Sequence, residues 1–320
     1  MSVRVLTESE VARLLSVGEA MTILEAAFRE AAAGRAALEP RRRVVTPPTV
    51  LHTMSATLPT WGVTGLKAYV TTPRGSRFVV LVFDAGSGEP VGLLAADRLG
   101  RIRTGAATGL ATRLLARPDA AVGALIGTGR QAETQLEAIC LARPLAEVRV
   151  FSRDPARRAA FVERMGSRVP ARLVAASSAE AAVRGADVVV TITNARQPVL
   201  HGAWLEPGAH VNAAGVNWPD RRELDEAAVR RASRIVVDDL ATARLEAGDL
   251  LPVVAAGHLR WEEVVELAAV VAGAAPGRQR ADEITLFSSQ GTALEDLACA
   301  ARVLERARAD GVGRDLPLLE

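Results

Sequence analysis

Lysine, cysteine and aromatic residues are all scarce in this chain of 320 residues. The two cysteines, Cys140 and Cys299, stand far apart in alanine-rich stretches, so the sequence predicts reduced core thiols and no disulfide framework. Aromatic residues make up only 3% of the chain, too few for the stacking platforms that bind single-stranded nucleic acid. No run of about 18 apolar residues is present, which excludes a membrane-spanning helix.

An excess of charge of one sign is also missing, because 39 basic residues are balanced by 37 acidic ones. A net charge of +2, with arginines interleaved among acids, gives little support to nucleic-acid binding. The N-terminal residues Met1–Arg4 lack the apolar core of a signal peptide. With 49% hydrophobic residues the chain can bury a large core, so we expect a cytoplasmic globular protein.

The scarcity of lysine is the most informative, because Lys67 is the one lysine among the 39 basic residues. An ammonium group can lose its proton when it is desolvated, whereas a guanidinium group keeps its proton. A single lysine in a chain that otherwise uses arginine therefore indicates acid–base or compact charge chemistry in a pocket. The alternative is a surface lysine without a role.

The chain contains two regions with different secondary-structure patterns. Up to Pro118 the β-rich segments 42–46, 50–58 and 65–72 precede a hairpin of 78–83 with 91–94, and a helix follows at 103–116. From Ala121 strands alternate with helices, which predicts a parallel sheet. The candidate strands cover residues 122–126, 148–152, 173–176, 187–193, 210–214 and 235–238. We predict an α/β fold with a Rossmann-type domain over 118–291 and a smaller α+β lobe over 1–117, onto which the helix at 292–309 and the remainder to 320 pack back.

A glycine-rich turn follows the first of these strands. Its residues are Gly127, Thr128, Gly129, Arg130, Gln131 and Ala132, a G-x-G-x-x-A pattern between a strand and a helix. In this context the first glycine permits the turn, the second lets the backbone approach a pyrophosphate, and the helix N-terminus favours the phosphates. A bare structural turn is the alternative to this predicted dinucleotide site.

The second strand of that domain ends in Ser152-Arg153-Asp154. A small polar residue followed by arginine suits a ribose 2′-phosphate, so this end favours NADP(H), while Asp154 keeps NAD(H) open. Thr193 ends the fourth strand, at the edge where a nicotinamide ribose would lie.

Three cations outside the Rossmann half could bind a substrate carboxylate: one of Arg41–Arg43, Lys67, and Arg103. Arg103 and Thr104 are predicted to open a helix, whose positive dipole end would add to the attraction. No metal site is expected, because the histidines lack paired spacing with acids or cysteines; they are His52, His201, His210 and His258. A nucleophile elbow is also absent.

The sequence resembles the ornithine cyclodeaminase/μ-crystallin family from Leu6 almost to its end. The segments that carry this resemblance are 65–67, 103–107, 127–132, 207–210, 215–219, 223–225 and 285–291. Family membership implies a homodimer formed through the strands of the N-terminal lobe, and bound NAD(H) or NADP(H). Carried over position by position, it implies a substrate-carboxylate and acid–base set of Arg42, Lys67 and Arg103, with Met54 lining the pocket. Thr104 would lie near the cofactor, and Gly127, Gly129 and Gln131 would hold the pyrophosphate.

One position departs from the family pattern. The resemblance places Asn217 where cyclodeaminases carry an aspartate that handles the substrate amine, and an amide cannot act as a base. We therefore predict an NAD(P)H-dependent reductase of small α-imino acids, such as cyclic ketimine carboxylates, or the reverse amino-acid dehydrogenase. The alternatives are ornithine cyclodeaminase, which forms proline and ammonia with recycled NAD⁺, and a non-catalytic protein that binds the cofactor or a small ligand.

Overall fold

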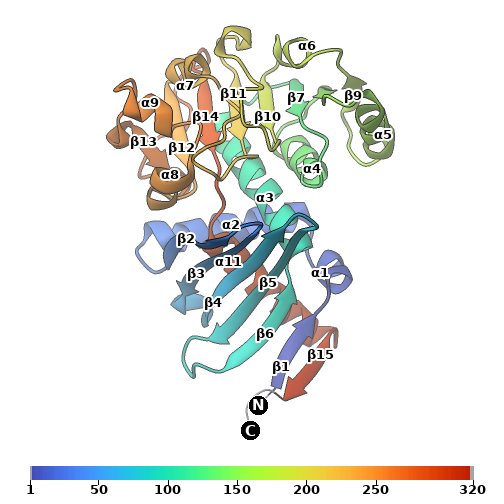
Figure 1. Ribbon diagram of the computed structural model, residues 1–320, viewed down its shortest axis with the longest axis vertical. Helices are drawn as coiled ribbons and strands as arrows, with labels where there is room; N and C mark the ends of the chain where they lie inside the picture. Colours follow the sequence, from blue (N-terminus) through green and yellow to red (C-terminus); the bar gives the residue numbers. More distant parts are fainter. Residues whose placement is uncertain (1, 318–320) are drawn as a thin grey trace. The chain divides into compact units, whose positions relative to one another are not determined.

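The computed structural model describes residues 2–317 and divides the chain into two compact units (Figure 1). Unit 1 contains the residues up to Arg103 together with those from Thr292 onward, and unit 2 is Thr104–Gly291. The division falls inside helix α3 (Asp97–Leu115), whereas the sequence placed it near Pro118. The difference arises because α3 is one unbroken helix that contributes its first two turns to unit 1.

Unit 1 is built on a seven-stranded sheet. Its order is β15 (Arg314–Pro317), β1 (Ser2–Leu6), β6 (Pro90–Ala95), β5 (Gly75–Asp84), β4 (Val63–Thr72), β3 (Thr49–Leu58) and β2 (Ala37–Thr46). Strands β2 to β6 pair antiparallel, and the β5–β6 pair is the hairpin predicted over 78–83 and 91–94. Strand β1 pairs parallel with β6 and antiparallel with β15, and the sequence prediction missed both of these strands.

Side chains alternate between two faces of this sheet. On β3, Met54, Ala56 and Leu58 are buried, and the intervening Leu51, Thr53 and Ser55 point the opposite way and are exposed. We call the buried side the inner face and the other the outer face. This alternation is the period of two that a strand imposes on its side chains.

Helix α11 (Ala293–Ala309) packs on the inner face, and α2 (Val17–Ala32) packs on α11. Glycines let α11 approach the sheet: a Cβ at Gly92 would collide with Leu304, and one at Gly65 would lie 3.0 Å from Leu297. Both helices begin with a capping box, at Thr292 and Ser16, which satisfies their first backbone N–H groups. Helix α1 (Glu8–Leu14) begins in the same way at Thr7.

The start of α3 corrects one prediction. The carboxylate of Glu8 accepts hydrogen bonds from the backbone N–H groups of Asp97 (2.8 Å) and Arg98 (2.7 Å) and so caps the helix. The helix therefore begins at Asp97, and Arg103 lies in its second turn. The prediction that Arg103 and Thr104 open a helix is wrong, because the cap comes from a distant segment of the chain.

Unit 2 is built on an eight-stranded parallel sheet. Its order is β13 (Val264–Glu266), β12 (Arg234–Val237), β14 (Thr285–Ser288), β11 (His210–Ala213), β10 (Val188–Thr191), β7 (Val122–Ile126), β8 (Glu147–Phe151) and β9 (Arg172–Ala175). The six predicted strands are confirmed to within two residues. Strands β13 and β14 were missed, since runs of three and four residues give no clear periodicity.

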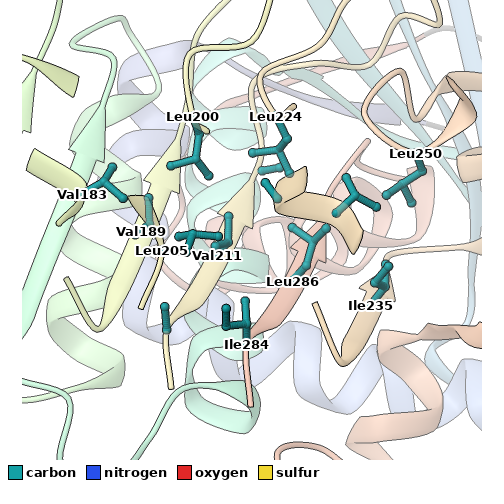
Figure 2. Packing of buried hydrophobic residues seen from close by; sticks show 14 of the residues in the cluster. Val183, Val189, Leu200, Leu205, Val211, Leu224, Ile235, Leu250, Ile284 and Leu286 are labelled. Atoms are coloured by element: carbon teal, nitrogen blue, oxygen red, sulfur yellow. The ribbon is translucent and has the colours of Figure 1, made fainter. Parts of the chain in front are cut away.

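Helices connect most of these strands in the right order for a Rossmann-type sheet, with the order reversing between β7 and β10. They are α4 (Ala132–Ala142), α5 (Pro155–Gly166), α6 (Ala179–Val183), α7 (Glu226–Arg231), α8 (Leu240–Glu246), α9 (Leu251–Ala255) and α10 (Leu267–Val271). One core fills each face of the sheet, and Figure 2 shows the one that includes Val189, Val211 and Leu286. Burial on both faces explains the continuous apolar runs of these strands. Within residues 2–317, every helix is too short or too polar to cross a membrane.

Candidate active site

The turn between β7 and α4 has the geometry of a phosphate-binding loop. Gly127 has φ of +114°, and a Cβ there would collide with the carbonyl of Ile192 at the end of β10. A Cβ on Gly129 would meet no atom within 4 Å, so its backbone faces open space. The buried Ala132 then begins α4 against the sheet. Local sterics therefore require glycine at the first position and leave the second open to a ligand.

A cavity opens at this turn, at the carboxyl ends of the parallel strands. Its wall includes the predicted cofactor residues Gly127, Thr128, Gly129, Arg130, Gln131, Ser152, Arg153, Asp154 and Thr193. It continues over the segment 194–199 after β10 and over Gly215 after β11. The glycine turn and the N-terminus of α4 fit the pyrophosphate of a dinucleotide. Thr104, predicted near the cofactor, is buried in α3 and lies outside the residues that line this cavity.

Arginines dominate one part of the wall. Arg130, Arg153, Arg157 and Arg196 all line the cavity. Asp154 is the N-cap of α5, where its carboxylate accepts a hydrogen bond from the backbone N–H of Arg157 at 3.1 Å and lies 3.4 Å from the Arg157 guanidinium. The Asp154 carboxylate is thus already engaged by the N-terminus of α5 and by Arg157. The residue that directly follows β8 is Ser152, which is neutral.

In unit 1, Lys67 lies on the inner face of β4 and is buried, with 3% of its surface exposed. Its Nζ donates a hydrogen bond to Oδ1 of Asp296 on α11 at 2.8 Å. The same Nζ lies 5.5 Å from the centre of the Phe78 ring, and a Cβ on Gly100 would come within 3.1 Å of it. The lysine therefore occupies a tight site between the sheet, α3 and α11.

Arg103 belongs to the same cluster. Its Nε donates to Oδ1 of Asp296 at 3.1 Å, and one of its terminal nitrogens donates to Glu295 at 2.8 Å. Glu295 also closes the capping box of α11 by accepting from the N–H and hydroxyl of Thr292. The first turn of α11 thus presents two buried carboxylates to Lys67 and Arg103, two of the three cations that the sequence singled out.

Burial and charge set the ionisation of this cluster. Desolvation lowers the pKa of Lys67 to about 8, with Arg103 and Arg41 acting in the same direction, although Asp296 opposes them. Burial disfavours the charged form of Asp296, but Arg103 and Lys67 outweigh it and hold the pKa of that carboxyl below its usual value. Lys67 is therefore mostly protonated at pH 7, and it releases its proton at a pH about one unit higher.

The arginine that lies with this cluster is Arg41, whereas the family resemblance implied Arg42. An extra residue in β2 between Glu39 and Arg42 shifts the register against β3. Arg42 then pairs with the outward-pointing Thr53, and 74% of its side chain is exposed. Arg41 is 5% exposed, and its charge acts on both Lys67 and His52. Simple alternation along β2 would have placed Arg42 on the inner face.

The remaining predicted pocket residue, Met54, is buried directly opposite Lys67 across β3 and β4. An aromatic stack continues along this face, with ring centres 4.0 Å apart for His52 and Tyr69 and 4.8 Å apart for Tyr69 and Phe78. Burial, followed by the charges of Arg43 and Arg41, lowers the pKa of His52 to about 4, so its ring is neutral at physiological pH.

Asn217 belongs to unit 2, in the loop after β11, and does not line the cavity described above. Among the residues that the structure describes, no three His, Cys, Asp or Glu side chains are arranged to hold a metal ion. Burial lowers the pKa of His210 to about 3, and its ring contacts Thr285 and Asn212.

The sequence prediction missed Glu295 and Asp296, and it included Arg41 only as one of three neighbouring candidates. A usable signal was present for the two acids, because adjacent carboxylates stand in the apolar, alanine-rich first half of the helix, at 293–301. Buried acids in such a helix imply buried cations elsewhere in the chain. No comparable signal distinguishes Arg41 from its neighbours.

Comparison with known proteins agrees with this architecture of a Rossmann-type unit and a smaller sheet-and-helix unit. Residues 1–311 match the Ornithine cyclodeaminase/mu-crystallin family. The alanine dehydrogenase of Archaeoglobus fulgidus is 36% identical, over 98% of both chains. The chain therefore belongs to the ornithine cyclodeaminase/mu-crystallin family.

Two solved structures resemble it over almost their whole lengths. The Delta(1)-pyrroline-2-carboxylate reductase of Thermococcus litoralis, in complex with NADH and L-proline, has a TM-score of 0.94 and 32% identity, and the match covers 98% of this chain and 100% of that one. An archaeal alanine dehydrogenase dimer with bound NAD has a TM-score of 0.93 and 34% identity, over 100% of both chains. Both support the α/β assignment predicted from the sequence.

Replacing Asp296 with Asn tests the electrostatics of the cluster. The substitution removes the charge that favours the ammonium form, so the pKa of Lys67 should fall further below 8, by about one unit or more. Because Lys67 is the sole lysine, selective ¹⁵N-lysine labelling gives one side-chain signal whose titration reports this pKa directly. The matched control is Glu305→Gln, an exposed acid on the same helix. A wild-type titration near 10.5 would contradict the assignment.

Proposed function

We propose that this protein is an NADPH-dependent reductase of small α-imino acids, cyclic ketimine carboxylates among them, and that it also catalyses the reverse oxidation of amino acids. The observation that carries the proposal is the buried Lys67, paired with Asp296 at 2.8 Å and with its pKa lowered to about 8. The phosphate-binding turn of unit 2 supplies the cofactor site. The proline and alanine enzymes to which the chain is similar support this choice of substrate class.

The positive inner face of unit 1 suits a substrate carboxylate. Arg41, Lys67 and Arg103 are all buried there, and guanidinium groups pair with carboxylates through two parallel hydrogen bonds. Glu295 and Asp296 already fix the orientation of Arg103. We assign Arg41 and Arg103 to the substrate carboxylate, because both side chains are buried on this face and their charges act on Lys67.

Lys67 handles the proton of the reaction. Reduction adds a hydride to the imine carbon and a proton to its nitrogen, and the electrons of the C=N π bond move to that nitrogen. When bound, the dinucleotide supplies the hydride and is itself oxidised. With a pKa of about 8, the Lys67 ammonium gives up its proton to the nitrogen more readily than an ordinary lysine, and Asp296 holds it in place.

Two alternative functions, ornithine cyclodeamination and non-catalytic binding, fit these residues less well. Cyclodeamination needs an acidic group at the substrate amine, and Asn217 is neutral. A non-catalytic binding protein has no use for a buried lysine with a lowered pKa, because burial of that charge destabilises the fold.

Steady-state assays of pyrroline- and piperideine-carboxylates, pyruvate with ammonia, and L-ornithine test the function. We expect NADPH oxidation with at least one imino acid, and no proline from ornithine. Replacing Lys67 with Arg keeps the charge but removes the titratable proton, so kcat should fall by about 10²- to 10⁴-fold while NADPH binding persists. Binding of NADPH without turnover of any substrate would favour the non-catalytic protein.

Replacing Arg41 with Ala tests the assignment of the substrate carboxylate. The Arg41→Ala variant should have a strongly raised KM for the imino acid, whereas the matched Arg42→Ala variant, at an exposed position, should keep the wild-type KM.

The arginine-rich wall of the cavity favours NADP(H) over NAD(H). A ribose 2′-phosphate carries about −1.5 to −2 charges, and Arg130, Arg153 and Arg157 line the cavity. The acidic residue that would hold a ribose diol is partly committed, because Asp154 caps α5 and pairs with Arg157. Ser152 leaves space for the phosphate where a carboxylate would repel it.

Replacing Arg153 with Ala tests this cofactor preference. Loss of one charge-assisted hydrogen bond of about 1.5–3 kcal/mol should raise KM for NADPH by about 10- to 100-fold and leave KM for NADH nearly unchanged. The control is Arg164→Ala, on the same helix α5, whose guanidinium pairs with Glu133. Equal effects on both cofactors would contradict a role in 2′-phosphate binding.

The outer face of the sheet is the surface that we assign to a homodimer. It carries exposed apolar side chains, with Val44 66%, Val79 41% and Leu51 39% exposed, next to the half-buried Leu66 and Leu81. An apolar sheet face of this kind is typical of an interface. The similar alanine dehydrogenase forms a dimer, which supports the assignment.

Sedimentation measurements test the dimer. The double replacement of Leu51 and Val79 with Asp places two charges on the outer face and should convert a dimer into a monomer. The control is Leu245→Asp on α8, which is also exposed (51%) but belongs to the other unit. A dimer that survives the double replacement would show that the interface lies elsewhere.

A further inference from the structure

Glu223 is a buried acid that the proposed chemistry does not use. It lies in the segment between β11 and α7, and none of its surface is exposed. Its Oε1 accepts hydrogen bonds from the backbone N–H (2.6 Å) and hydroxyl (2.7 Å) of Thr193. Its Oε2 accepts from the hydroxyl of Thr191 (3.0 Å) and the backbone N–H of Gly215 (2.8 Å). Four donors from the ends of two strands thus converge on one carboxylate.

Two of these partners belong to the wall of the dinucleotide cavity. Thr193 follows β10 and Gly215 follows β11, and both line the cavity. The two segments touch: a Cβ on Gly215 would collide with the backbone of Thr193 and lie 2.6 Å from Oε2 of Glu223. Glu223 therefore sits directly behind the wall and joins the two segments that form it.

A second buried acid supports Glu223 from behind. Oδ1 of Asp249, which follows α8, accepts from the backbone N–H groups of Glu223 (2.7 Å) and Leu224 (2.8 Å). Burial, followed by the charge of Asp249, raises the pKa of Glu223 to about 7, although its hydrogen bonds oppose this. Burial likewise raises the pKa of Asp249 to about 6, against the charge of Arg222. The ends of β10 and β11 contribute only hydroxyl and N–H groups to Glu223. The nearby Asp225 hydrogen-bonds with His201 and accepts from the backbone N–H of Ala228 at the start of α7.

We propose that Glu223 is a positioning residue of the cofactor site, which holds the Thr193 and Gly215 segments in the shape that binds the dinucleotide while its carboxylate is ionised. An ionised carboxylate accepts all four hydrogen bonds. A protonated one donates its O–H to the hydroxyl of Thr191 or Thr193, and its hydroxyl oxygen is then a weaker acceptor for the backbone N–H of Gly215 or Thr193 on the same side. Protonation therefore loosens one of the two segments. The inference rests on the proposed dinucleotide site but not on the proposed substrate.

The consequence is a pH-dependent affinity for the cofactor. If binding requires the ionised form, Kd is constant well above pH 7 and rises below it, by at most about tenfold per pH unit for a single proton. The sign follows from linkage: a ligand that selects the deprotonated form binds more weakly as the proton concentration rises. The 2′-phosphate of NADPH also titrates near pH 6, so the ratio of variant to wild-type Kd at each pH is the useful quantity.

Fluorescence titration of NADPH and NADH between pH 6 and 9, without substrate, tests the proposal. In Asp249→Asn the side-chain oxygen can still accept both N–H groups, but the charge that raises the pKa of Glu223 is lost. The midpoint of the Kd profile should therefore shift to lower pH by about one unit. Glu223→Gln should bind about tenfold more weakly at pH 8 and lose the Glu223-dependent part of the profile.

The matched control is Asp225→Asn, a nearby acid that accepts from the N–H groups of Gly202 (2.9 Å) and Ala228 (2.8 Å) at the start of α7. The Asp225→Asn variant should have a lower Tm and keep the wild-type dependence of Kd on pH.

An unchanged midpoint in Asp249→Asn, or wild-type affinity in Glu223→Gln, would overturn the proposal. If Glu223→Gln fails to fold, the Asp249→Asn midpoint decides. A protein that binds dinucleotide with this profile but reduces no imino acid contradicts only the proposed function, and one that binds no dinucleotide contradicts both.

Discussion

Burial of the Lys67 ammonium against the Asp296 carboxylate is the interaction on which the rest of unit 1 depends. Removing two charges from water is costly, and the cost is recovered only when the pair is close and well hydrogen-bonded. The close packing of α11 over Gly65 and Gly92 brings Asp296 within 2.8 Å of Lys67. Arg103 and Glu295 then complete a network of two cations and two anions. The small residues of the sheet are thus part of the electrostatic arrangement, because they set the depth at which α11 lies.

The two buried acids, Asp296 and Glu223, show how neighbours decide what burial does. Both are removed from water, which disfavours their charged forms. Asp296 has two cations beside it, and its pKa is held below the usual value. Glu223 has neutral donors and a second acid, and its pKa rises to about 7. The same residue class therefore serves as a permanent counter-charge in unit 1 and as a group that can titrate near neutral pH in unit 2.

Local features of the site could be predicted from the sequence, and features that depend on distant contacts could not. The glycine turn at Gly127 and Gly129 is a local pattern between a strand and a helix, and the structure gives it the expected geometry. The partner of Lys67 is 229 positions away in the chain, so no local pattern connects them. The start of α3 was misjudged because its cap comes from Glu8. Arg42 was carried over from the family resemblance, and the sequence does not reveal the extra residue in β2 that leaves Arg42 exposed and Arg41 buried.

The single lysine is explained by two constraints that act together. Arginine would keep its proton at every physiological pH, so it could not take part in proton transfer. It is also larger, and Gly100 already approaches Nζ so closely that even a methyl group on it would lie 3.1 Å away. The compact ammonium of lysine suits the space beside Gly100 better than a planar guanidinium does. The site therefore favours a cation that is compact and able to titrate, and lysine meets both conditions where arginine does not.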